Sequence, residues 1–160
     1  MKTKIPPPIV AIISILLTYL SKDYLGFFYL HPHIQKTLFI LFLVSGILLI
    51  FFANREFKIL ETTVNPMKPK NATNLVSKGV FKFTRNPMYL GLFLILISFS
   101  FNFSSLFGLV IYGPLFIFYI TIFQIIPEEE ALIELFGESY KEYCSKAVSY
   151  THLRAHETDS

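Results

Sequence analysis

Four apolar stretches constrain the fold more than any other feature of the sequence. They cover residues 8–20, with an extension toward residue 30, and residues 37–53, 89–103 and 106–126. Since a bilayer core of about 30 Å needs about 20 helical residues, the second and fourth stretches are adequate, whereas the first and third need tilt, thinning or partial re-entry. At 53% hydrophobic residues, the chain is too apolar for an ordinary soluble domain. We therefore predict an all-α integral membrane protein with about four transmembrane helices.

The charges outside these stretches indicate how the chain crosses the membrane. The segment between the second and third stretches carries seven basic residues against two acidic ones: Arg55, Lys58, Lys68, Lys70, Lys78, Lys82 and Arg85 against Glu56 and Glu61. The positive-inside rule places this segment in the cytoplasm. Because the number of spans is even, both termini are then cytoplasmic, in agreement with Lys2 and Lys4. Since the basic residues are concentrated in this loop, we expect no nucleic-acid partner.

Two further segments are interpreted as connections. Residues 102–105, NFSS, supply polar turn residues that join the last two stretches into a hairpin, and Pro114 is expected to kink the fourth helix. Residues 21–36 are interpreted as an interfacial outer loop. Their two histidines, His31 and His33, lack a neighbouring carboxylate or cysteine cluster, so we expect no metal site. The lone Cys144 is assigned no role.

The segment after the fourth stretch, PEEEALIELFGESYKEY, is predicted to form an amphipathic cytoplasmic helix. Pro127 suits its first turn, and the three acids that follow suit the N-terminal end of the helix dipole. Glu128 and Glu129 fall toward the apolar face, whereas Glu130 and Glu134 fall on the other side, with Glu130 expected in water. That apolar face comprises Leu132, Ile133, Phe136, Tyr140 and Tyr143. A carboxylate on an apolar face at membrane depth needs a partner, and the nearest positive charges are Arg85 and the basic loop.

The polar cluster RNPMYLG, residues 85–91, stands directly before the third stretch. Because Asn86 precedes a proline, it is disfavoured in the helical region, and the third helix is predicted to start at Pro87. The free N–H groups of that start face the loop and suit an anionic or electron-rich group. An ordinary helix start explains the same residues equally well, and spacing alone does not decide between the two interpretations.

The end of the chain raises a separate question. Residues 148–158, VSYTHLRAHET, match the in-frame translation of a transposon adapter used in sequencing libraries. We therefore expect a single domain over residues 1–147, a non-native tail over residues 148–160, and a natural gene truncated near Ala147. His152, Arg154 and His156 look like a catalytic cluster, but they belong to this tail and are set aside.

Three segments together resemble the isoprenylcysteine carboxyl methyltransferase and phospholipid methyltransferase superfamily, in particular its small bacterial members. They are TTVNPMKP, LVSKGVFKFTRNPMYLG and IPEEEALIELFGESYKEY, within residues 62–146. The shared pattern is Gly, an aromatic, Arg-[His/Asn]-Pro-x-Tyr-x-Gly, a hydrophobic hairpin, Glu-Glu-x-x-Leu, and Phe-Gly-x-x-Tyr-x-x-Tyr. Every element occurs here in that order.

The resemblance implies an S-adenosylmethionine-dependent methyltransferase of the bacterial inner membrane that acts on a lipophilic acceptor by O- or N-methylation. Arg85 and Glu129 are the implied catalytic residues. Asn86 stands where the prenylcysteine enzymes usually have His, which argues against a prenylcysteine substrate. The family usually continues with Val-x-Arg after the last tyrosine, so we expect this chain to lack an arginine of the active site. The implied cofactor pocket comprises Gly79, Phe81, Arg85, Asn86, Pro87, Tyr89, Gly91, Glu128 and Glu129.

The residue types fit that chemistry. Arg85 and the start of the third helix suit the carboxylate of the cofactor, and Glu128 or Glu129 suits its ammonium group or ribose hydroxyls. Methyl transfer is an in-line displacement, so the protein mainly aligns the two reactants and excludes water. Two other functions stay open: a nicotinamide-dependent membrane reductase of a related fold, and a non-catalytic membrane scaffold. The sequence determines neither the acceptor nor the oligomeric state.

Overall fold

The computed structural model describes residues 5–24, 28–59 and 75–147. Their elements are α1 (Pro7–Ser21), α2 (Pro32–Ile59), η2 (Gly79–Lys82), α3 (Pro87–Asn102), η3 (Gly108–Tyr112), α4 (Gly113–Ile120), η4 (Thr121–Ile125), α5 (Ile126–Phe136) and α6 (Glu138–Lys146). η2 is a 3-10 turn, whereas η3 and η4 are π-helical turns. The described residues contain no strand, which confirms the all-α prediction for this part of the chain. The TTVNPMKP motif and the tail at 148–160 lie outside the described residues.

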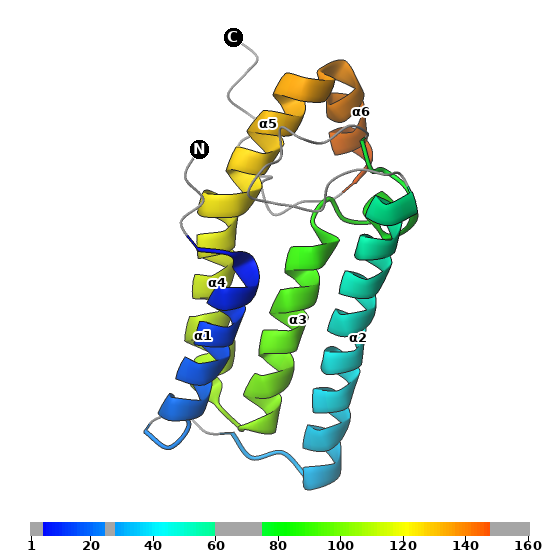
Figure 1. Cartoon of the computed structure of the whole chain (residues 1–160). Helices are drawn as coiled ribbons and strands as arrows, with labels where there is room; N and C mark the ends of the chain where they lie inside the picture. Colours follow the sequence, from blue (N-terminus) through cyan, green and yellow to red (C-terminus); the bar gives the residue numbers. More distant parts are fainter. Residues whose placement is uncertain (1–4, 25–27, 60–74, 148–160) are drawn as a thin grey trace.

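The helices α1, α2, α3 and α4 lie side by side as a bundle in which successive helices run in opposite directions (Figure 1). The start of α1, the end of α2 and the start of α3 lie toward one end of this bundle, where α5 and α6 also lie. We call this the α5–α6 end. Segments that are distant in the sequence therefore meet there.

Within the described residues, two helices are long and apolar enough to cross a membrane: Pro32–Ile59, with 28 residues, and Gly108–Phe136, with 29. The apolar helices α1 and α3 have only 15 and 16 residues. The sequence predicted this difference in length. The interpretation of residues 21–36 as a loop is wrong at its end, because α2 begins at Pro32. The Gln35 side-chain amide in the first turn of α2 donates to the carbonyls of Phe101 and Asn102, at 3.0 and 3.1 Å, and ties the helix to the end of α3.

The burial pattern separates the inside of the bundle from its outside. Thr18 and Ser100 are fully buried. Their hydroxyls donate to carbonyls of their own helices, at Ser14 and Leu96, over 2.8 and 3.1 Å. Large apolar side chains instead face outward along the long helices. Small polar residues inside and large apolar ones outside are typical of helices packed together in lipid. Outward examples are Ile12, Leu41, Phe51, Leu115 and Phe118.

The fourth helix runs without interruption from Gly108 to Phe136 and contains two π turns. Pro114 and Pro127 each lie in the first turn of the α-helical segment that follows a π turn. A proline lacks an N–H group and its ring crowds the carbonyl four residues earlier, so a wider turn makes room for it. A π turn precedes Pro114 in the helix. The sequence predicted a separate helix from Pro127, but α5 continues the fourth helix.

The amphipathic helix predicted over residues 127–143 is broken at Gly137, which has a φ of +52°. This left-handed conformation is open to glycine at little cost and ends α5 before α6 begins. The break changes the direction of the helix axis, and Tyr140 and Tyr143 of α6 then pack in one cluster with Phe136 of α5. Ile133, predicted on the same apolar face, is 43% exposed, so the prediction is wrong for this residue.

The helices α2 and α3 approach each other closely at two glycines, Gly46 and Gly91. A Cβ atom on Gly46 would lie 2.6 Å from the Gly91 carbonyl oxygen, and one on Gly91 would lie 2.7 Å from the Gly46 carbonyl oxygen. Each glycine therefore makes room for the backbone of the opposite helix. Lipid gives helices no hydrophobic reason to associate, so such close packing is a main source of their affinity.

Replacing either glycine by alanine is expected to destabilise the bundle. The added methyl group must push two backbones apart, which costs about 1–3 kcal/mol. We expect Gly46→Ala and Gly91→Ala each to lower the thermal midpoint of the detergent-solubilised protein by several degrees. Leu48→Ala, on the outward face of α2, is the control and is expected to change the midpoint little. A Gly91→Ala midpoint equal to that of the wild type would contradict the close approach of α2 and α3.

Candidate active site

The candidate site lies at the α5–α6 end of the bundle, above a small apolar cluster. This cluster contains Ala53 of α2, Phe81 of η2, and Tyr140 and Tyr143 of α6. Gly79 starts η2 with a φ of +58°, and a Cβ atom there would overlap the Glu56 carboxylate. Only glycine fits this turn without strain. The turn places Phe81 and the segment that follows it against α6.

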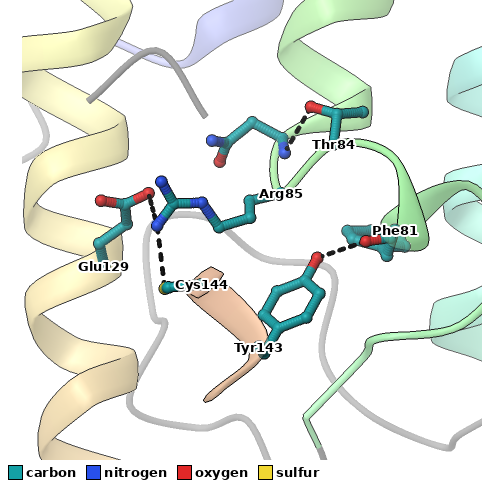
Figure 2. Close-up of polar contacts among 7 residues, drawn as sticks. Phe81, Thr84, Arg85, Glu129, Tyr143 and Cys144 are labelled. Carbon is teal, nitrogen blue, oxygen red and sulfur yellow. Dashed lines mark hydrogen bonds and ion pairs between the residues drawn. The ribbon is translucent and has the colours of Figure 1, made fainter. Parts of the chain in front are cut away.

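Arg85 forms the centre of the polar contacts. Its Nη1 atom lies 3.2 Å from Oε1 of Glu129 on α5 and 2.9 Å from Sγ of Cys144 on α6 (Figure 2). The Arg85 and Glu129 side chains are only 9% and 15% exposed. Burial alone lowers the pKa of the guanidinium, but the Glu129 carboxylate and Cys144 outweigh it, so the pKa of Arg85 lies above its ordinary value. Arg85 is therefore a permanent cation that joins three separate elements.

A second polar contact lies beside the first. The Tyr89 hydroxyl, from the first turn of α3, donates to Oε2 of Glu128 at 2.9 Å. Glu128 and Glu129 therefore both contact residues at the start of the third helix, whereas Glu130 is exposed. The separation of these acids into two kinds agrees with the helical register predicted from the sequence. Of two neighbouring carboxylates, Glu128 thus contacts a phenol and Glu129 a guanidinium.

The helix α6 is fastened to the η2 turn by a hydrogen bond. The Tyr143 hydroxyl donates to the Phe81 carbonyl oxygen at 2.7 Å (Figure 2). Burial raises the pKa of Tyr143, so its hydroxyl stays neutral and remains a donor across the physiological range. Sequence reasoning assigned Tyr143 only to an apolar face and did not find this bond or the contact between Cys144 and Arg85. The spacing of Cys144, four residues after the buried Tyr140, was the available signal.

The remaining predicted site residues occupy different positions. The third helix starts at Pro87, as predicted, and the carbonyl of the buried Asn86 accepts the Leu90 N–H at 3.0 Å. The Asn86 N–H donates to the Thr84 hydroxyl at 3.3 Å. Arg85, Tyr89, Glu128 and Glu129 are brought together, and Gly79 and Phe81 lie in the adjacent turn. Gly91 instead packs against α2 (Gly46).

One polar residue in the fourth helix was not singled out from the sequence. Gln124, in η4, is 1% exposed, and its Nε2 atom donates to the Ile5 carbonyl oxygen at 3.0 Å. Its Oε1 atom is buried and has no hydrogen-bond partner among the described residues. Leaving such an acceptor unpaired costs about 1–3 kcal/mol. A lone glutamine in an apolar run was the signal that sequence reasoning could have used.

The arrangement can hold a small molecule that carries both signs of charge. Arg85 offers a cation and Glu128 and Glu129 offer carboxylates within one half-buried site. Among the described residues, no group of three or more His, Cys, Asp or Glu side chains could hold a metal ion. Together, these features define an all-helical bundle, with two helices long and apolar enough to cross a membrane and a charged site at one end.

Comparison with known families identifies the kind of protein. The family model described as phospholipid methyltransferase matches residues 34–139, which is more than half of the chain. The chain therefore belongs to the phospholipid methyltransferase family, within the superfamily that its motifs resemble. The matched range contains Arg85, Tyr89, Glu128 and Glu129. Comparisons with curated proteins and with solved structures give no significant match.

The buried ion pair makes a prediction about stability. Arg85→Leu leaves the Glu129 carboxylate without its cation, which is expected to cost about 3–5 kcal/mol. The double variant Arg85→Leu/Glu129→Leu removes both charges and is expected to regain much of that loss. Unfolding midpoints of the two variants in detergent test this. Lys146→Ala, which removes one partner of the exposed pair with Glu142, is the control and should change the midpoint little. A double variant less stable than Arg85→Leu would contradict the argument.

Proposed function

We propose that this chain is an S-adenosylmethionine-dependent methyltransferase that acts on a lipophilic acceptor in the membrane. The observation that supports this most is the pairing of Arg85 with Glu129 and of Tyr89 with Glu128 at one end of an apolar bundle. These four side chains lie within the residues that match a methyltransferase family. That family membership favours methyl transfer over the reductase and scaffold alternatives.

The charges of the site fit the cofactor. S-adenosylmethionine carries a carboxylate and an ammonium group at one end, and Arg85 and Glu129 already offer the complementary pair. If the ligand carboxylate takes Arg85 and its ammonium takes Glu129, each protein charge exchanges one partner for another. The exchange leaves no unpaired charge in the half-buried site, so it avoids the large desolvation cost of a lone ion. Glu128 is then available to the ribose hydroxyls.

The proposed methyl transfer needs little chemical reactivity from the side chains of the protein. When bound, the cofactor would supply a methyl group on its sulfonium. An acceptor oxygen or nitrogen would bond to the methyl carbon as the carbon–sulfur bond breaks, so that S-adenosylhomocysteine leaves and any proton lost by the acceptor passes to solvent. Arg85 and Glu129 hold one end of the ligand, and the bond between Tyr143 and Phe81 holds α6 beside them. These contacts would fix the position of the donor, which is a main contribution of a protein to such a displacement.

The outward apolar faces suggest a route by which the second substrate, the methyl acceptor, would reach the site. Side chains such as Leu115 and Phe118 of α4 face away from the bundle. A bilayer that covers these faces would deliver an acceptor laterally, while the charged cofactor would enter from the aqueous α5–α6 end. We therefore propose a lipid or lipophilic small molecule as the acceptor, methylated on oxygen or nitrogen.

A matched pair of glutamate variants tests whether S-adenosylmethionine binds beside Glu129. Glu129→Gln is expected to remove a charge-assisted hydrogen bond of about 1.5–3 kcal/mol, which weakens S-adenosylmethionine binding about ten- to a hundredfold. Glu130→Gln, on the exposed side of α5, should change binding little. Calorimetry on the detergent-solubilised protein measures both, with Arg85→Ala as a second site variant.

Equal affinities for the two glutamate variants would contradict the placement of the cofactor beside Glu129, and an unchanged Arg85→Ala would contradict the site as a whole. Binding of a reduced nicotinamide cofactor in place of S-adenosylmethionine would favour the reductase alternative.

We also propose that α1, α2, α3 and the fourth helix all cross the membrane, with both termini and residues 54–84 in the cytoplasm. The basic residues of this segment support the orientation, since positive loops stay inside. In a Cys144→Ser background, Lys82→Cys is expected to react with an impermeant thiol reagent only in inside-out vesicles. Tyr29→Cys should react only in spheroplasts. Labelling of both positions from the same side would contradict four crossings.

A further inference from the structure

The buried amide of Gln124 points to a ligand contact that the methyl-transfer site does not yet explain. Its Nε2 atom donates to the Ile5 carbonyl oxygen at 3.0 Å. A carbonyl oxygen can only accept, so this bond fixes which end of the amide faces Ile5. The Oε1 atom is therefore held in one orientation, and it lacks a hydrogen-bond partner among the described residues. A fixed, buried and unpaired acceptor is suited to a donor group that a ligand brings.

The position of Gln124 relates it to the candidate site. It lies four residues before Glu128, about one helical turn away, and the π turn η4 lies between Ile120 and Ile126. Glu128 faces the bundle through its bond to Tyr89, and Gln124 faces the bundle because it is 1% exposed. The polar groups along this face of the helix therefore run in the order Glu129, Glu128, Gln124.

That order matches the order of groups in the proposed cofactor. The amino-acid end of S-adenosylmethionine is charged, the ribose carries hydroxyl donors, and the base carries an exocyclic amino group. With the amino-acid end at Arg85 and Glu129 and the ribose at Glu128, the base extends along the helix toward Gln124. We propose that Oε1 of Gln124 accepts a hydrogen bond from the amino group of the adenine base, and thereby determines specificity for adenine. This inference rests on the proposed function.

The contact with Ile5 favours the cofactor over the membrane acceptor as the partner of Gln124. Ile5 lies two residues before Pro7, the first residue of α1, and α1 starts toward the α5–α6 end of the bundle (Figure 1). Gln124 is therefore held at the end from which a water-soluble ligand arrives.

The experiment compares two ligands on the full chain in detergent. The probes are S-adenosylhomocysteine and its 6-deamino analogue, in which hydrogen replaces the amino group of the base. The wild type is expected to prefer S-adenosylhomocysteine by about ten- to a hundredfold, because the analogue leaves Oε1 unpaired. In Gln124→Met, which keeps an unbranched side chain of similar length, the preference should fall to within about threefold. Calorimetry or equilibrium dialysis measures the ratio within each variant.

A matched control uses another buried polar atom of the same helix, in Tyr119. The Tyr119 hydroxyl is also buried without a hydrogen-bond partner among the described residues. Tyr119→Phe should retain the full preference for adenine, because the inference concerns Gln124 alone. Gln124→Leu provides a second test if Gln124→Met does not fold, and thermal unfolding identifies which variants are folded.

The possible outcomes separate this inference from the proposed function. If the wild type binds both probes equally while Arg85→Ala weakens both, the cofactor site stands and the adenine contact is wrong, with Oε1 bound to water only. The same conclusion follows if Gln124→Met keeps the wild-type preference. If the wild type binds neither probe, both the proposed function and this inference fail. Loss of the preference in Gln124→Met but not in Tyr119→Phe supports the contact.

Discussion

A charge in an apolar protein needs a partner, and the ion pair between Arg85 and Glu129 meets this requirement at the α5–α6 end of the bundle. The pair also organises the structure around it. Arg85 comes from the segment that begins α3, Glu129 from α5, and the same guanidinium contacts Cys144 of α6. One planar group thus links three elements. Because that group carries a complementary charge beside it, a ligand of mixed charge can replace the pairing instead of adding a new ion.

The features that the sequence predicted are those set by local chemistry. The start of α3 at Pro87 follows from the geometry of a proline and of the residue before it. The separation of Glu129 from the exposed Glu130 follows from the period of a helix. The proximity of Arg85 to Glu129 could be anticipated because a carboxylate on an apolar face needs a cation nearby. Family membership was also accessible from the motifs, because each lies in a short segment.

The features that the sequence did not predict depend on how distant segments pack. Gly91 belongs to the family motif, but only the bundle shows that its missing side chain admits the backbone at Gly46. The break at Gly137 was missed because the apolar pattern continues across it, and a periodic pattern does not report a change in axis. The bond from Gln124 to Ile5 joins residues 119 positions apart. No local rule connects such a pair.

The two π turns of the fourth helix affect the direction in which the acidic side chains of the site point. Each wide turn takes up residues without advancing the helix as far as an α turn does, and it changes the direction of every side chain that follows. Removing one residue from the α-helical segment α4 would instead rotate Glu128 and Glu129 by about 100° and turn them away from α3. The exposed Leu115 of α4 occupies one of those positions. The length of this outward-facing segment therefore sets the direction of the acids, so an insertion or deletion there would move both of them away from α3 while leaving every residue of the candidate site in the sequence.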